Sequence, residues 1–172
     1  MLTLFIYLIA ALIALLLLVS LGLKIAYRPP RDDSTHTPQD EGIDYQDISL
    51  TTEKGNTLRG WFLPQPEPAP SMIILHGWGA SASLMLPLAT PLYHAGFNIL
   101  LFDARNHGHS DSEGQSALPR FAEDLHLAIA WLQNSAQHHN GQIVLTGHSV
   151  GAGAVLLEAS RRQDIAAVIS LS

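Results

Sequence analysis

The chain has 172 residues, a formal net charge of −6 and no cysteine. This length allows one modest domain with short accessories, and the lack of cysteine excludes disulfides, thiolate metal sites and thiol nucleophiles from the chain. Hydrophobic residues make up 47% and charged residues 14%, which excludes disorder throughout. An acidic chain has no basic surface to neutralise a row of phosphates, so we expect no nucleic-acid partner.

The first element is an uncharged apolar run from Leu2 to Leu23. As a helix it would span roughly 30 Å, the thickness of the hydrocarbon core of a bilayer. A cleaved signal peptide would begin with a positive region and have a shorter apolar stretch, and Lys24 stands where a small-residue cleavage site would be needed. We therefore expect residues 1–23 to form a retained transmembrane anchor, in contact with the membrane through residues 2–23, rather than a signal peptide or a buried core helix.

The segment after the apolar run is polar. Lys24, Arg28 and Arg31 follow the run and no basic residue precedes it, so the positive-inside rule places the rest of the chain in the cytoplasm. Residues 24–42 are rich in Pro, Asp, Ser and Thr and have no apolar periodicity. They predict a flexible stalk.

From residue 43 onward the pattern is that of an α/β domain. Apolar and polar residues alternate in 47–52 and 58–63, with Gly55-Asn56 between them, which predicts an antiparallel hairpin. A proline-rich loop follows at 64–70. Continuous apolar runs at 72–75, 98–102, 142–145 and 167–171 predict strands buried on both faces, and helices are expected at 83–95, 121–132 and 152–161. Residues 43–172 thus predict a mostly parallel sheet with an amino-terminal hairpin and helices on both faces.

The chain stops at Ser172, on the last residue of an expected central strand. A natural terminus usually lies beyond such an element, and the last strand would be left with an unpaired edge. We therefore expect a partial domain, which is either a partial sequence of a longer protein or a truncated product.

The sharpest motif is Gly147-His148-Ser149-Val150-Gly151, which matches G-x-S-x-G. It lies between an expected strand and an expected helix, and a serine at such a tight turn projects its hydroxyl above the sheet edge. The amino end of the helix points toward any negative charge that develops there. Ser149 is therefore the candidate nucleophile.

Two other interpretations of these residues stay open. Residues 146–153 (TGHSVGAG) also match the phosphate-binding turn of short-chain dehydrogenases, which would bind NAD(P). In that family, however, the turn follows the first strand of the domain, and here it follows the fifth. The motif could also be a structural glycine-rich turn with an idle serine.

Two further motifs end the preceding parallel strands: Leu75-His76-Gly77-Trp78-Gly79, and residues 103–110 (DARNHGHS). With the serine motif, they closely resemble the α/β-hydrolase family over about residues 43–172, in particular its lipase, esterase and serine-peptidase-like branches. The resemblance is specific for the superfamily and says little about the substrate.

The resemblance implies a cofactor-free hydrolase of ester, thioester or amide bonds that acts through an acyl-serine intermediate. Its substrate would be a small molecule or a lipid or acyl compound, and no metal is implied. Ser149 would be the nucleophile, and the backbone N–H groups of Trp78 and Val150 would form the oxyanion hole, worth several kcal/mol of barrier lowering. The supporting residues would be His76, Gly77, Gly147 and Gly151.

The resemblance also assigns a structural role to the loop that contains Asp103, Arg105, His107 and Gly108. Family members often have glycine where Asn106 stands.

The remaining histidines are weaker candidates. His138 and His139 lie in a polar loop, and we expect them to be solvated and not metal-bound. His148 neighbours the nucleophile, but adjacent residues of a strand point to opposite sides, so we expect it to be poorly aimed at the serine. His107 and His109 are weak candidates for side chains that lie in the site.

The chain lacks the rest of a catalytic triad. In this fold the order is Ser, then Asp or Glu, then His. No histidine follows Ser149, and Asp164 precedes the last expected strand, where it cannot be the triad acid. We therefore expect the chain to have little or no hydrolase activity by itself. The alternative is a non-catalytic, membrane-tethered α/β module that binds a partner or a small ligand.

Overall fold

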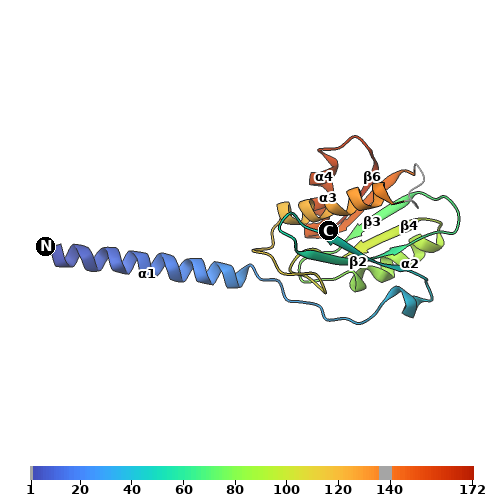
Figure 1. The fold of residues 1–172 in the computed structure, drawn as a ribbon. Helices are drawn as coiled ribbons and strands as arrows, with labels where there is room; N and C mark the ends of the chain where they lie inside the picture. Colours follow the sequence, from blue (N-terminus) through green and yellow to red (C-terminus); the bar gives the residue numbers. More distant parts are fainter. Residues whose placement is uncertain (1, 136–140) are drawn as a thin grey trace.

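Helix α1 (Leu2–Ala26) carries the amino-terminal apolar run and extends three residues past it. The computed structural model describes residues 2–135 and 141–172, so the predicted solvation of His138 and His139 concerns residues outside the described ranges. None of the residues of α1 is buried, and the helix projects from the body as a separate rod (Figure 1). It is long and apolar enough to cross a membrane.

The body is built on one sheet of six strands in the order β1-β2-β4-β3-β5-β6. The strands are β1 (Gln46–Thr51), β2 (Thr57–Leu63), β3 (Ser71–Leu75), β4 (Asn98–Phe102), β5 (Ile143–His148) and β6 (Ile165–Leu171). Strand β2 pairs antiparallel with both β1 and β4, and the strands from β4 to β6 pair in parallel. This confirms the predicted amino-terminal hairpin and mostly parallel sheet.

Helices cover both faces of the sheet, as predicted. The helices of the body are η1 (Pro38–Glu41), η2 (Ser83–Met85), α2 (Leu86–His94), α3 (Leu118–Asn134) and α4 (Val150–Ala159). Side chains alternate between the two faces of a strand. In β3, Ile73 and Leu75 accordingly join the core under α3 and α4, whereas Met72 and Ile74 join the core that includes α2 residues. The continuous apolar runs of β3 and β4 therefore do mark strands buried on both faces.

Two predictions about strands near the motif were wrong in detail. Strand β5 continues to His148 rather than ending at 145, because its pairing with β6 continues to the His148–Leu171 register. Strand β6 is half-buried or exposed along its length rather than fully buried, since β5 is its one pairing strand among the residues described.

The polar segment after α1 lies along the body (Figure 1). It includes the short helix η1, and the side chains of Arg31 and Asp32 form hydrogen bonds to loops of the body. The division into an anchor at 1–23, a stalk at 24–42 and a domain at 43–172 stays a prediction.

Candidate active site

Ser149 lies at the sharp turn between β5 and α4. Its backbone has φ 55° and ψ −118°, a conformation that residues with a Cβ rarely adopt and that costs on the order of 1–3 kcal/mol. The Ser149 N–H donates to the Leu171 carbonyl at 2.8 Å, which fixes the turn to the end of β6. The residue itself is exposed. A strained turn therefore presents the serine at the surface, at the carboxyl end of the parallel strands.

The two glycines of the motif allow this turn to pack closely. A Cβ at Gly147 would overlap the backbone of Gly151 and would lie 2.7 Å from the nitrogen of Ala152. A Cβ at Gly151 would overlap the carbonyl groups of Leu75 and His76. The turn at Gly147–Gly151, called the elbow below, is therefore in backbone contact with the end of β3, which only glycine permits.

The turn after β3 contacts the elbow directly. A Cβ built on Gly77 would lie 3.1 Å from the Cβ of Ser149. In the part of the chain that the structure describes, the N–H groups of Trp78 and Val150 donate to no protein acceptor. Val150 is the first residue of α4, where N–H groups have no partner within the helix. The turn from His76 to Gly79 is called the oxyanion turn below. It contains an N–H group without a protein acceptor among the described residues, that of Trp78, and the elbow contains another, that of Val150.

His76 links the oxyanion turn to the loop after β4. The Ala104 N–H donates to its Nε2 at 3.0 Å, so Nδ1 carries the proton and donates to the Gly77 carbonyl at 2.7 Å. Burial lowers the pKa of His76 to about 4. A neutral imidazole with both nitrogens engaged is a structural support and not a base.

His107 packs beside His76 and also does not face the solvent. Its ring centroid lies 5.0 Å from those of His76 and Phe121 and 6.0 Å from that of Trp78. Its Nδ1 lies 2.9 Å from the Arg105 carbonyl, and burial, the largest cause, lowers its pKa to about 4. His107 therefore helps to shape the floor of the oxyanion turn. His109 is exposed instead, with Nδ1 3.8 Å from an Asp103 oxygen.

His148 is exposed and lies over the oxyanion turn. Its Nδ1 would be 3.1 Å from a Cβ on Gly77, the same distance at which that Cβ would meet Ser149. The alternation of side chains along a strand does not extend through the positive φ of Ser149, so His148 and Ser149 both approach Gly77. No hydrogen bond joins His148 to Ser149 among the described contacts.

The loop after β4 is held by buried polar contacts. The Asp103 carboxylate accepts from the N–H groups of Ala82 (2.7 Å) and His109 (2.8 Å), and burial raises its pKa. Gly108 packs against this carboxylate where any Cβ would overlap it. Asn106 has φ 69°, the left-handed conformation that favours glycine.

Asp164 lies at the start of β6, at the opposite end of that strand from Leu171. It forms an ion pair with Arg162 at 2.6 Å and accepts from Gln133 at 2.6 Å. The Arg162 guanidinium lowers its pKa to about 2. Within the described ranges, no three His, Asp or Glu side chains converge as metal ligands would.

Several known proteins are similar to this chain in sequence and in fold. A family model described as serine aminopeptidase, S33, matches residues 66–172. An esterase of Pyrococcus furiosus is similar in structure, with a TM-score of 0.77 and 29% identity, covering 83% of this chain and 56% of its own. A polyketide transferase of a Penicillium species is 32% identical over 129 residues, which are 73% of this chain and 44% of that protein.

Protein YfhR of Salmonella typhimurium is 30% identical over 149 residues, which are 84% of this chain and 49% of that protein. The chain thus spans about half the length of the curated relatives it matches. The matched family residues include the oxyanion turn, the loop after β4 and the elbow, and they make up more than half of the chain. The chain therefore belongs to the serine aminopeptidase S33 family of the α/β-hydrolases.

Proposed function

We propose that the chain is the nucleophile-bearing part of a membrane-anchored serine hydrolase that cleaves ester, thioester or amide bonds. The observation that carries this proposal is the exposed Ser149 at a strained elbow, beside a turn with an unused N–H donor. A structural glycine-rich turn would have no need to expose a serine in so costly a conformation. Membership of a serine-hydrolase family supports the same role over the short-chain-dehydrogenase interpretation.

In the proposed reaction, the Ser149 oxygen attacks the substrate carbonyl carbon and its proton passes to a base. The tetrahedral oxyanion accepts hydrogen bonds from the N–H groups of Trp78 and Val150. The intermediate then collapses to an acyl-serine and the protonated leaving group, and water releases the acid product. His76 holds the carbonyl of Gly77, and the close contacts of Gly77, Gly147 and Gly151 hold the turn against the elbow.

No residue after Ser149 supplies the base, because no histidine follows it in this chain, and Asp164 lies at the far end of β6, paired with Arg162. A serine without a base is a weak nucleophile. We therefore propose that residues 1–172 alone have little activity. This makes the full-length product of the gene the material for every test of catalysis.

A serine-directed fluorophosphonate tests the nucleophile in that full-length product. We expect labelling of the wild type and none of Ser149→Ala. Ser160→Ala is the matched control, because Ser160 is an exposed serine at the other end of α4, and its labelling should equal that of the wild type. Equal labelling of Ser149→Ala would overturn the proposal and favour the non-catalytic, membrane-tethered module.

We also propose that α1 anchors the protein and that the body is cytoplasmic. The length and hydropathy of α1 support the anchor, and Lys24, Arg28 and Arg31 support the orientation. Because the chain has no cysteine, a single cysteine can be introduced at exposed Ser160 without background. In right-side-out vesicles, a membrane-impermeant maleimide should label it only after the membrane is opened. Labelling in intact vesicles would reverse the orientation.

A further inference from the structure

The segment just after the anchor is hydrogen-bonded to the loops around the candidate active site. Arg31 Nη1 donates to the Gly108 carbonyl at 2.8 Å, and its Nη2 donates to the Ser110 carbonyl at 2.7 Å and to Ser112 Oγ at 2.8 Å. These three acceptors belong to the loop after β4. Residues 30–36, called the strap below, are therefore fixed to that loop by three hydrogen bonds from one guanidinium.

The strap also contacts the oxyanion turn and the chain that leaves it. A Cβ at Gly79 would lie 2.8 Å from Pro30 Cγ, so the proline ring packs on that glycine. Asp32 accepts a hydrogen bond from Ser81 Oγ, and Ser83 Oγ donates to the carbonyl of His36 at 2.7 Å. Contacts therefore continue from the strap through the oxyanion turn to Ser149.

The strap starts very close to the end of the anchor. Helical hydrogen bonds continue to Tyr27 N–H and Arg28 N–H, at 2.9 and 3.1 Å. Pro30 follows Ala26 by four residues, which span at most about 14 Å when fully extended. The polar layer on each side of a bilayer's hydrocarbon core is roughly 6 Å thick. An anchored α1 therefore holds the oxyanion turn within or just above the lipid headgroups.

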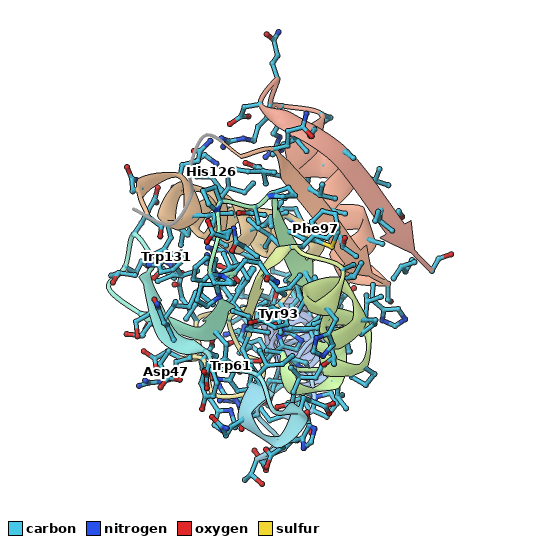
Figure 2. The ribbon with its side chains drawn as sticks, turned by 90° about the vertical axis from the view of Figure 1, so that its right-hand side faces the viewer. Asp47, Trp61, Tyr93, Phe97, His126 and Trp131 are labelled. Atoms are coloured by element: carbon cyan, nitrogen blue, oxygen red, sulfur yellow. The ribbon has the colours of Figure 1, made fainter. Side chains whose placement is uncertain are left out.

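The active-site edge of the sheet is the one that faces the anchor. Figure 2 views the molecule from the side turned away from α1. Pro30, four residues after the end of α1, packs on Gly79, and Gly79 follows the carboxyl end of β3. The amino ends of the parallel strands are therefore the ends farther from α1. Their carboxyl ends, where Ser149 lies, face toward it.

The side chains at this edge suit a membrane surface. Trp78 is 39% exposed beside the strap, and Leu118, which begins α3 and packs next to Gly153 of α4, is 37% exposed. Tyr27 is exposed at the end of α1, with Lys24 and Arg28 on either side of it in sequence. Aromatic and basic residues are the types found at the headgroup level.

From this arrangement we infer that the substrate is an acyl ester that resides in the membrane and reaches Ser149 from the headgroup layer. The inference rests on the proposed serine-hydrolase function, and it names the substrate class. The short connection after α1, with the strap bound to the body, places the carboxyl edge of the sheet against the lipid surface. There a long acyl chain can stay in the bilayer while its ester group enters the site.

Fluorescence quenching tests the placement without using activity. The full-length product is reconstituted into phosphatidylcholine vesicles with lipids brominated on the upper acyl chain, which quench nearby tryptophan. We expect quenching that is lost in Trp78→Phe and retained in the matched control Trp61→Phe. An insertion of about ten Gly and Ser residues between Arg28 and Pro29 leaves the contacts of Arg31 in place, adds roughly 18 Å of reach and should also abolish the quenching. Quenching unchanged by both Trp78→Phe and the insertion would overturn the inference.

Paired substrates separate this inference from the proposed function. The wild type and the insertion variant are compared on a water-soluble short-chain ester and on a diacylglycerol ester held in vesicles. The insertion should lower the vesicle rate by about 10-fold or more through lost local concentration, and leave the soluble rate unchanged. Unchanged vesicle rates would overturn the inference alone. Absence of Ser149-dependent turnover of either ester would also overturn the inference, whereas equal fluorophosphonate labelling of the wild type and Ser149→Ala would overturn the proposed function.

Discussion

The loop after β4 and the elbow after β5 end neighbouring parts of the same sheet edge, but they use polar residues in opposite ways. In the loop, Arg105 donates to Asp124 through its side-chain Nε at 2.7 Å and through its backbone N–H at 2.8 Å, and both residues are buried. At the elbow, Ser149 is exposed and the N–H of Val150 has no protein acceptor in the described chain. Unused polar groups, rather than numerous ones, mark the place where chemistry can occur.

This contrast teaches how to interpret polar motifs in a sequence. Residues 103–110 contain two histidines, an aspartate and an arginine, which resembles a catalytic cluster. In the structure most of these groups bind backbone, each other or buried acidic side chains such as Asp124, and His107 is buried. The serine motif has fewer ionisable groups, yet it alone combines exposure with backbone strain.

The largest expected effect separates activity from stability at the elbow. Ser149→Ala should reduce turnover by the full-length product by at least about 10³-fold, because no other group can form the acyl intermediate. Alanine keeps the Cβ, so the free energy of unfolding should stay within about 0.5 kcal/mol of the wild type. Ester hydrolysis and urea unfolding measure the two quantities. A large loss of stability would show that Ser149 is also a structural residue.

The next effect should appear in the loop, as stability. Arg105→Ala leaves the fully buried Asp124 carboxylate without its cation, which should cost about 3–5 kcal/mol in urea unfolding. Arg120→Ala is the matched control. Arg120 also contacts Glu113 and Glu123, but it is 35% exposed, so its loss should cost about 1 kcal/mol or less. Equal costs for the two variants would contradict the contrast between buried and exposed pairs.

The pH dependence of stability should come from His76, with a contribution of the same sign from His107. Their folded pKa values of about 4 lie below the ordinary value of 6.5, so the unfolded chain binds more protons between these values and stability falls as pH decreases from about 6.5 to 4. Full burial of His76 makes its part of this loss as much as about 3 kcal/mol. Asp103 and Asp124, whose pKa values burial raises, act in the opposite direction at the acid end.

Urea unfolding between pH 7 and 4.5 measures this slope. His76→Gln can still accept from Ala104 and donate to Gly77, but it cannot be protonated, so its slope should be smaller. A slope that is the same in wild type and His76→Gln would assign the effect elsewhere.

The smallest expected effect comes from the backbone strain at Ser149. Ser149→Gly removes the Cβ from a conformation that favours glycine and should raise the free energy of unfolding by about 1 kcal/mol, even though it abolishes activity. Comparison with Ser149→Ala isolates the strain, since neither variant has the hydroxyl. A glycine variant that is no more stable than the alanine variant would show that the elbow is unstrained.

Much of the fold could be predicted because its signals are local. The prediction of strand 98–102 matches β4, and the hairpin and the helices after β3, β4 and β5 were found within a few residues of their ends. Helix α4 begins at Val150 rather than at 152, because the elbow leaves no residue between Ser149 and the helix.

The parts that could not be predicted depend on contacts between distant residues. Arg31 binds backbone carbonyls nearly eighty positions away, and a carbonyl is present at every residue, so no sequence pattern indicates this pairing. The direction of His148 depends on the positive φ of the next residue, which the pattern of a strand does not contain. The exposure of β6 likewise depends on what lies beside it in space.

The strand order has a consequence for how this protein can vary. After β3 the chain places β4 on one side, then crosses back to place β5 on the other. Such a reversal of winding separates the loops that leave the two neighbours and opens a crevice above the strand between them. At this edge the turn at Gly147–Gly151 and the end of β3 meet through backbone atoms, so the side chains around them can change in sequence while Ser149 keeps its position against Gly77.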